Sequence, residues 1–169
     1  MMLLGFGSGF PLLFSSQILK IWILDVGGTL EQVGFVSILS LPYLLAFLWM
    51  PIFDYWVGSG VWKRTSIISI CFMLCALLLY LSSFYNPNQG YYGLMSIAGL
   101  IAIVGATQDH LIEAYRLFLL PEKYKNIGVS ISLVGFRVAV MLAGGGGMLY
   151  ASQFGWSVMY ISSSILMLC

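Results

Sequence analysis

The chain has 169 residues, of which 60% are hydrophobic and 8% are charged, and its mean hydropathy is +0.98. A soluble domain carries about 25% charged residues. The composition therefore excludes a water-soluble fold and predicts an all-α integral membrane protein in a lipid bilayer. The net charge of +1 provides no basic surface, so we expect no nucleic-acid partner.

Six apolar stretches predict six membrane-spanning helices in a single bundle that covers 1–169. About 20 helical residues cross a hydrocarbon core of about 30 Å. Gly27 and Gly28 break the first apolar run, and a turn signal at 86–90 divides the long uncharged stretch that follows Thr65. The predicted spans are about 1–24, 32–53, 66–85, 91–114, 127–151 and 157–169.

The last of these spans is short. A helix over 157–169 is about 20 Å long, which is less than a membrane crossing. A helix that ends inside hydrocarbon leaves its last carbonyl groups without partners. We therefore expect five complete transmembrane helices and a truncated sixth.

The placement of lysine and arginine predicts a cytoplasmic N-terminus, because cytoplasmic loops carry an excess of these residues. The first odd-numbered loop holds Asp25 and Glu31, and the other two odd-numbered loops hold no charge. The even-numbered loops lie on the same side of the membrane as the N-terminus. They hold five of the seven basic residues, namely Lys63, Arg64, Arg116, Lys123 and Lys125.

The strongest functional signal lies near the end of the fourth span, where Asp109, Glu113 and Arg116 are spaced i, i+4, i+7. This spacing puts them within about 60° of one another on one helix face. Charged groups at membrane depth cost several kcal/mol unless they are paired or wet, and two neighbouring carboxylates can share a proton. We predict that Asp109 and Glu113 couple transport to protons. The alternative is a charge-paired helix end that anchors the fourth span at the headgroups.

Two further places carry polar residues inside predicted spans. Arg137 lies about ten residues into the fifth span, where we expect it to face the bundle interior and meet an anion. That anion is Asp109 or Glu113 in one interpretation and an anionic substrate group in the other. Gln17 and Lys20 follow Pro11 in the first span and are candidates for lining a cavity, although close packing of that helix is the alternative.

Motifs of catalysis are missing from the sequence. It contains no G-x-S-x-G, H-E-x-x-H or nucleotide-binding P-loop pattern, and its three cysteines show neither metal-ligand nor redox spacing. We therefore predict neither an enzyme nor a metal or other cofactor.

Short motifs follow one another along the whole chain. They are Leu4–Leu12, Leu41–Tyr43, Phe47–Pro51, Ala106–Asp109, Glu113–Arg116, Leu120–Glu122, Gly135–Arg137, Gly144–Gly147 and Gly155–Trp156. In order and spacing, these motifs resemble those of AmpG-type permeases, which belong to the major facilitator superfamily. The resemblance corresponds to the N-terminal half of such a permease.

This resemblance implies proton-driven import of anhydro-muropeptides, which are peptidoglycan fragments, across the bacterial inner membrane. The residues it implies for gating in the loop after the second span are Asp54, Lys63 and Arg64. The candidates for contact with substrate or for ion pairs are Arg137, Arg116, Gln108, Gln17 and Lys20. Because the family has a second helical half, the resemblance also implies a partner half-transporter or self-association.

Three other interpretations remain open from the sequence. The chain is a truncated gene fragment without transport activity in the first, an acetyl-CoA-type carrier of the same superfamily in the second, and a membrane assembly subunit in the third.

Overall fold

The computed structural model describes residues 1–57 and 61–168, without the side chains at positions 54, 56, 57, 61, 62, 88 and 89. Within these residues the chain forms helices and turns, with no strand. Five described helices are long and apolar enough to cross a membrane: Met2–Asp25, Leu30–Leu48, Lys63–Ser82, Gly90–Leu119 and Glu122–Phe154. The predicted all-α membrane bundle is confirmed, while its treatment as one domain over 1–169 stays a prediction.

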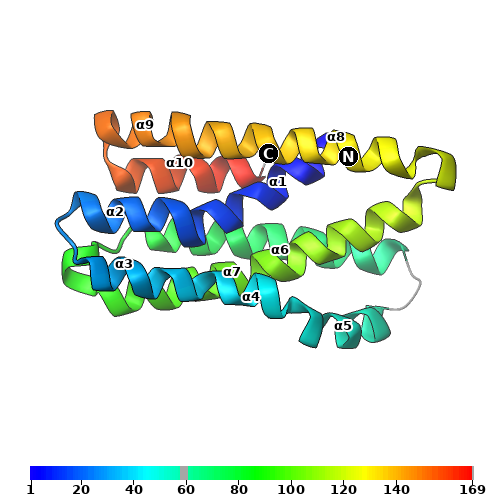
Figure 1. Cartoon of the computed structure of the whole chain (residues 1–169), viewed down its shortest axis with the longest axis horizontal. Helices are drawn as coiled ribbons and strands as arrows, with labels where there is room; N and C mark the ends of the chain where they lie inside the picture. The colour runs from blue at the N-terminus through cyan, green and yellow to red at the C-terminus, as the bar shows by residue number, and fades with distance from the viewer. Residues whose placement is uncertain (58–60, 169) are drawn as a thin grey trace.

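The described helices lie side by side, and consecutive long segments run in opposite directions (Figure 1). The α2–α3, α6–α7 and α9–α10 connections gather at one end of the bundle, and the α7–α8 connection lies at the other. In chain order the elements are α1 (Met2–Leu12), η1 (Leu13–Ile18), α2 (Leu19–Asp25), α3 (Leu30–Val36), η2 (Ser37–Ser40), α4 (Leu41–Leu45), η3 (Ala46–Leu48), α5 (Met50–Val57), α6 (Val61–Ser82), α7 (Pro87–Leu119), α8 (Glu122–Val140), η4 (Met141–Gly146), α9 (Gly147–Phe154) and α10 (Trp156–Leu168).

Local signals explain two of the sharp connections. Gly27 and Gly155 adopt positive φ angles of 83° and 89°, which a residue with a Cβ atom rarely tolerates. After the first turn, Thr29 caps α3 with a reciprocal pair of hydrogen bonds. The Gln32 backbone N–H donates to Thr29 Oγ1 at 3.3 Å, and the Thr29 backbone N–H donates to Gln32 Oε1 at 2.9 Å.

The segment predicted as one continuous span over 32–53 is instead a chain of short helices. The 3₁₀ turns η2 and η3 interrupt it and contain Ile38 and Phe47, respectively. Each of these residues lies four positions before a proline, Pro42 or Pro51. A proline has no N–H to donate to that carbonyl, so the α-helical ladder breaks at both places and tightens into 3₁₀ geometry.

The first helical segment is the centre of the bundle, since Met2–Asp25 is buried more completely than the other four long helices. It packs mainly against α8, in a parallel arrangement that places Gly5 beside Ser132 and Gly9 beside Ala139. Gly135 of α8 lies against the backbone at Met2 in the same way. Small residues allow two helices to approach closely in a membrane, where van der Waals contact drives their association.

An aromatic cluster fixes α10 against the first segment near the Gly155 turn. Trp156 donates its indole N–H to Asp25 Oδ2 at 2.7 Å. Its ring stacks on Trp22 with the two centroids 6.0 Å apart, and Trp22 also contacts Tyr160. Indole rings favour the membrane–water interface, so this cluster marks one interfacial end of the bundle.

We expect Gly135→Ala to destabilise the protein, because the new Cβ atom would overlap the Met2 backbone, which cannot move aside as a flexible side chain can. Overpacking of this kind costs about 1–3 kcal/mol. The matched control is Gly34→Ala in α3, where an added Cβ meets nothing within 4 Å. Thermal unfolding in detergent, followed by size-exclusion chromatography, should show a lower midpoint for Gly135→Ala only. Equal midpoints would contradict the packing described for α1 and α8.

Candidate functional site

A polar cavity of about 270 Å³ lies between α7 and α8 and reaches α1. One wall comes from α7, the opposite wall from α8, and α1 contributes Ser8. Its lining combines ionisable, hydroxyl and apolar side chains. The lining residues are Ser8, Asp109, Ile112, Glu113, Arg116, Val129, Ser132, Leu133 and Phe136.

The three charged residues of α7 line this cavity together, as their spacing predicts, and they differ in exposure. The Glu113 side chain is 59% exposed, whereas the Arg116 side chain is 11% exposed. Arg116 Nη2 donates to Glu113 Oε1 at 3.3 Å, and no described residue accepts a hydrogen bond from Arg116 Nε. An ion pair with one exposed partner contributes about 0–1 kcal/mol, so this pair adds little to stability, and Arg116 Nε is buried without a partner among the described residues.

Asp109 lies one helical turn before Glu113, toward the middle of α7, and is half-buried. Ser8 of α1 lines the same cavity. Its hydroxyl group donates to the Gly5 carbonyl at 3.0 Å. The hydroxyl group and the Arg116 guanidinium group therefore give Asp109 a polar environment within an apolar bundle.

Gln108, the neighbour of Asp109, has a structural position that the sequence did not indicate. It is fully buried, and its Nε2 group donates to the Gly7 carbonyl at 3.4 Å. Gly7 lies four residues before Pro11, which has no N–H to donate to that carbonyl. The Gln108 side chain thus supplies the hydrogen bond that Pro11 removes from α1, and it does not line the polar cavity.

Tyr43 completes this packing from α4. A Cβ atom at Gly105 would overlap both Tyr43 Oη and Pro11, so a glycine is required where α1, α4 and α7 meet. Tyr43 Oη and Gln108 Oε1 are buried, and neither has a hydrogen-bond partner among the described residues. Buried polar groups usually have a hydrogen-bond partner. The two unpaired oxygen atoms are therefore an unfavourable feature of the packing next to Asp109.

Arg137 does not pack into the interior of the described bundle, and its contact with an anionic group of the substrate stays a prediction. Its side chain is exposed, and no ion pair joins it to Asp109 or Glu113 in the part of the chain that the structure describes. The face of α8 that packs on α1 is occupied by the small residues Gly128, Ser132, Gly135 and Ala139. Arg137 lies off this face, one turn beyond the cavity-lining residue Leu133.

The other predicted residues lie apart from the cavity. Gln17 is exposed in η1 and Lys20 is half-buried in α2. Of the predicted gating residues, Lys63 is exposed, while the side chain of Asp54 lies outside the described residues. Arg64 is buried, with its guanidinium carbon 5.8 Å from the centroid of the Phe118 ring.

Sequence reasoning proposed three of the nine residues that line the cavity and missed the other six, which include Ser8, Ser132 and Phe136. Ser8 and Ser132 belong to small-residue patterns that first indicate helix packing, and only the approach of α1 to α8 brings both residues to the cavity that α7 also lines. No group of three or more His, Cys, Asp or Glu side chains among the described residues could hold a metal ion.

Comparison with known proteins gives relatives for the whole chain, although no family model matches it. An uncharacterised protein of Haemophilus influenzae is 33% identical over 97% of this chain. The anhydromuropeptide permease of Escherichia coli K12 is 28% identical over 100% of it. A Rickettsia felis protein that carries the transporter name AmpG 1 is 28% identical over 94% of it.

The chain spans 35–39% of the length of these relatives. The resemblance to AmpG-type permeases is confirmed, and the chain is a multi-pass membrane protein. The two named relatives are a permease and a transporter, and neither name supports the acetyl-CoA carrier or the assembly subunit considered from the sequence.

The geometry of the cavity predicts an order of reactivity for cysteines introduced into a cysteine-free form of the chain. Glu113→Cys should react fastest with a charged, water-soluble thiol reagent, and Asp109→Cys should react more slowly but completely. Gln108→Cys and Leu111→Cys should be protected, because both native side chains are fully buried. Mass spectrometry after timed labelling measures these rates. Similar rates at Asp109 and Leu111 would show that water does not enter the cavity.

Proposed function

We propose that this chain forms part of a secondary transporter that imports anhydro-muropeptides across the bacterial inner membrane, driven by protons, with its N-terminus in the cytoplasm. The observation that carries the proposal is the position of Asp109: it belongs to a long apolar helix, and its carboxyl group lines a polar cavity between helices. The substrate class comes from the similarity to the named permease. The predominance of basic residues in the even-numbered loops supports the orientation.

Asp109 is the proposed proton site. An ionised carboxylate in hydrocarbon has a high free energy. Loss of water from the cavity therefore favours the protonated form of Asp109. When water enters, it solvates the ionised form, and the positive charge of Arg116 in the same cavity stabilises it further. A carboxyl group whose hydration alternates in this way can carry a proton across with the substrate.

Glu113 and Arg116 lie in the same cavity, with Glu113 the more exposed of the two. We assign Glu113 the exchange of protons between Asp109 and water, since it lies one turn away on the same face. Arg116 holds the pair in position and keeps one guanidinium N–H unpaired among the described residues. Gln108 supports the site by fixing α7 to α1 next to Asp109.

Arg137 is the proposed contact for an anionic group of the substrate. It is exposed in a long apolar helix and forms no ion pair with an acidic residue that the structure describes. A cation at membrane depth needs an anion or water, and the peptide part of a muropeptide carries carboxylate groups. Gln17 and Lys20 are weaker candidates for contact with the same ligand.

A single helical bundle does not provide alternating access, which requires one bundle to move against another around a shared site. Since this chain spans 35–39% of its relatives, we propose that a second helical unit completes the transport path. That unit is a further part of the same protein, a separate half-transporter or a second copy of this chain.

The central test is uptake of labelled anhydro-muropeptide by cells that lack their own permease. The chain is expressed alone and also joined to the part of the Escherichia coli permease that it does not match. Asp109→Asn preserves the size of the side chain but cannot bind and release a proton, so proton-dependent uptake should be lost. The control, Glu122→Gln, alters an exposed carboxylate paired with Lys125 and should transport normally. Unchanged proton dependence in Asp109→Asn would refute the coupling role.

A second test concerns Arg137. Arg137→Gln should raise the KM for a muropeptide severalfold because the positive charge is lost, and Arg137→Lys should restore most of the affinity. Lys123→Gln removes an exposed charge outside the cavity and serves as the control. If Arg137→Gln lowers only the amount of protein in the membrane, with an unchanged KM, the residue is structural.

A further inference from the structure

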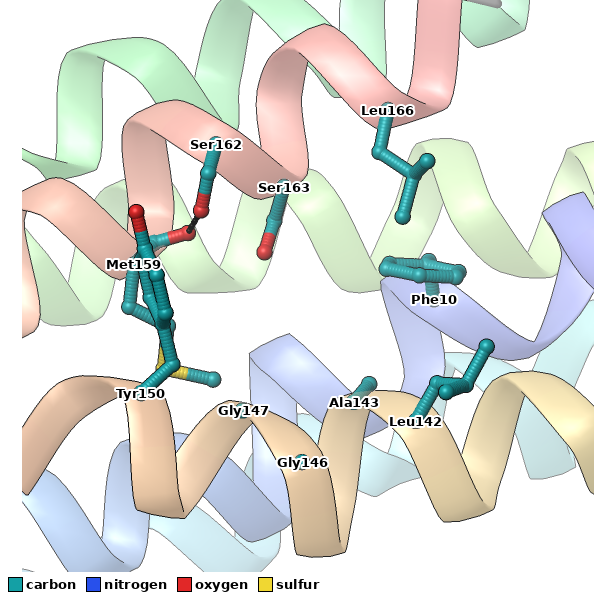
Figure 2. Close-up of a pocket in the computed structure, with 10 residues that line it drawn as sticks. All are labelled: Phe10, Leu142, Ala143, Gly146, Gly147, Tyr150, Met159, Ser162, Ser163 and Leu166. Atoms are coloured by element: carbon teal, nitrogen blue, oxygen red, sulfur yellow. Dashed lines mark hydrogen bonds between the residues drawn. The ribbon is translucent and has the colours of Figure 1, made fainter.

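A second cavity, of about 450 Å³, lies between α9 and α10 and is separate from the Asp109 cavity. We call it the α9–α10 groove. Figure 2 shows Tyr150 at one end and Leu142 and Leu166 at the other, with Phe10 of α1 behind them. Its lining residues are Phe10, Leu142, Ala143, Gly146, Gly147, Tyr150, Met159, Ser162, Ser163 and Leu166.

The groove exists because one of its walls lacks side chains. Gly146 and Gly147 form that wall where η4 passes into α9. A Cβ atom at Gly146 would meet nothing within 4 Å, whereas one at Gly147 would overlap the end of the Met159 side chain. Gly146 therefore leaves open space beside α10, while α9 and α10 approach each other closely at Gly147 and Met159.

The lining is mostly apolar, and its polar residues are Tyr150, Ser162 and Ser163. Phe10 and Met159 form a buried floor, and Leu142 and Leu166 are 54% and 47% exposed at the rim. The Ser162 hydroxyl group donates to the Met159 carbonyl at 2.9 Å, so it does not demand a polar ligand. An apolar cavity of this size stays dry or binds an apolar ligand.

The dimensions favour an occupant narrower than a helix. From Leu142 to Tyr150 the groove follows eight residues of helix, which is about 12 Å. Its volume of about 450 Å³ then corresponds to a mean cross-section of roughly 40 Å², whereas a helix 10–12 Å wide needs about 80–110 Å². A single extended hydrocarbon chain is narrow enough to lie in this space.

The direction of the groove matches a lipid in the bilayer. Tyr150, at one end, lies about 8 Å along the helix from the Gly155 turn, where Trp156 and Asp25 mark the interface. Leu142 and Leu166 lie deeper, within helices that are apolar throughout. A chain attached to a headgroup near the Gly155 turn would therefore run past Tyr150 toward the middle of the membrane.

We propose that the α9–α10 groove binds one acyl chain of a membrane phospholipid. The proposal is independent of the transported substrate, because the groove shares no lining residue with the Asp109 cavity. The acyl chain would fill the space beside Gly146 and Gly147 and pack against Phe10 of the central helix.

The test uses the chain in nanodiscs that contain a phospholipid with a photoreactive diazirine on one acyl chain. After irradiation, mass spectrometry maps the adducts. Labelling at Leu142 and Leu166 should exceed, severalfold, that at Ile131 and Val134, which are exposed to a similar degree on α8 but line neither cavity. Equal labelling at the two sets would mean ordinary contact with surrounding lipid and would overturn the proposal.

A matched pair of variants sharpens this test. Gly146→Leu fills the groove, while Gly145→Leu makes the same change at a neighbouring position that also has open space but does not line it. Groove labelling should fall to background in Gly146→Leu and persist in Gly145→Leu. Gly146→Ala, a smaller filling, should give an intermediate loss even if the leucine variant misfolds. Equal labelling of the Gly145 and Gly146 variants contradicts a built acyl-chain site.

Discussion

The structure depends on a hydrogen bond that α1 cannot make for itself. Pro11 leaves the Gly7 carbonyl without its usual helical donor, and Gln108 of α7 donates to it at 3.4 Å. In a bilayer an unsatisfied carbonyl costs several kcal/mol, so this contact fixes the position of α7 against the central helix. The next residue along each helix, Ser8 and Asp109, then faces the polar cavity. On each helix, the residue that makes the packing contact is thus followed directly by a residue that lines the cavity.

The same approach of helices explains the shape of the rest of the bundle. Gly105 allows Pro11 and Tyr43 to meet α7, while Gly5 and Gly135 bring α1 against α8. With α1 held between α7 and α8, those two helices contact each other little, and a cavity remains between them. The small residues create the cavity without lining most of it, and the charged face of α7 gives the cavity its chemistry.

What could be predicted from the sequence is what depends on one segment at a time. Apolar length predicted the five long helices, and helical periodicity placed Asp109, Glu113 and Arg116 on one face. The failures involve contacts between segments. The exposure of Arg137 depends on which face of α8 meets α1. The role of Gln108 depends on a carbonyl 101 positions away in the sequence. The two prolines, Pro42 and Pro51, do indicate helix breaks in the sequence. The span was nevertheless predicted as continuous because its apolar composition extends across both.

The charged cluster of α7 has two interpretations, a proton-coupling site and a headgroup anchor. The environment of Asp109 distinguishes them. A headgroup anchor needs only exposed, paired charges at a helix end, and the Glu113–Arg116 pair meets that requirement. Asp109 does not, since it is half-buried a turn farther from that end, next to Ser8 and Gln108. A membrane protein gains no stability from a carboxyl group there, and asparagine would fill the same space without the charge. The polar cavity around it is what makes a carboxyl group tolerable at that depth, and the capacity to bind and release a proton is what distinguishes it from its isostere.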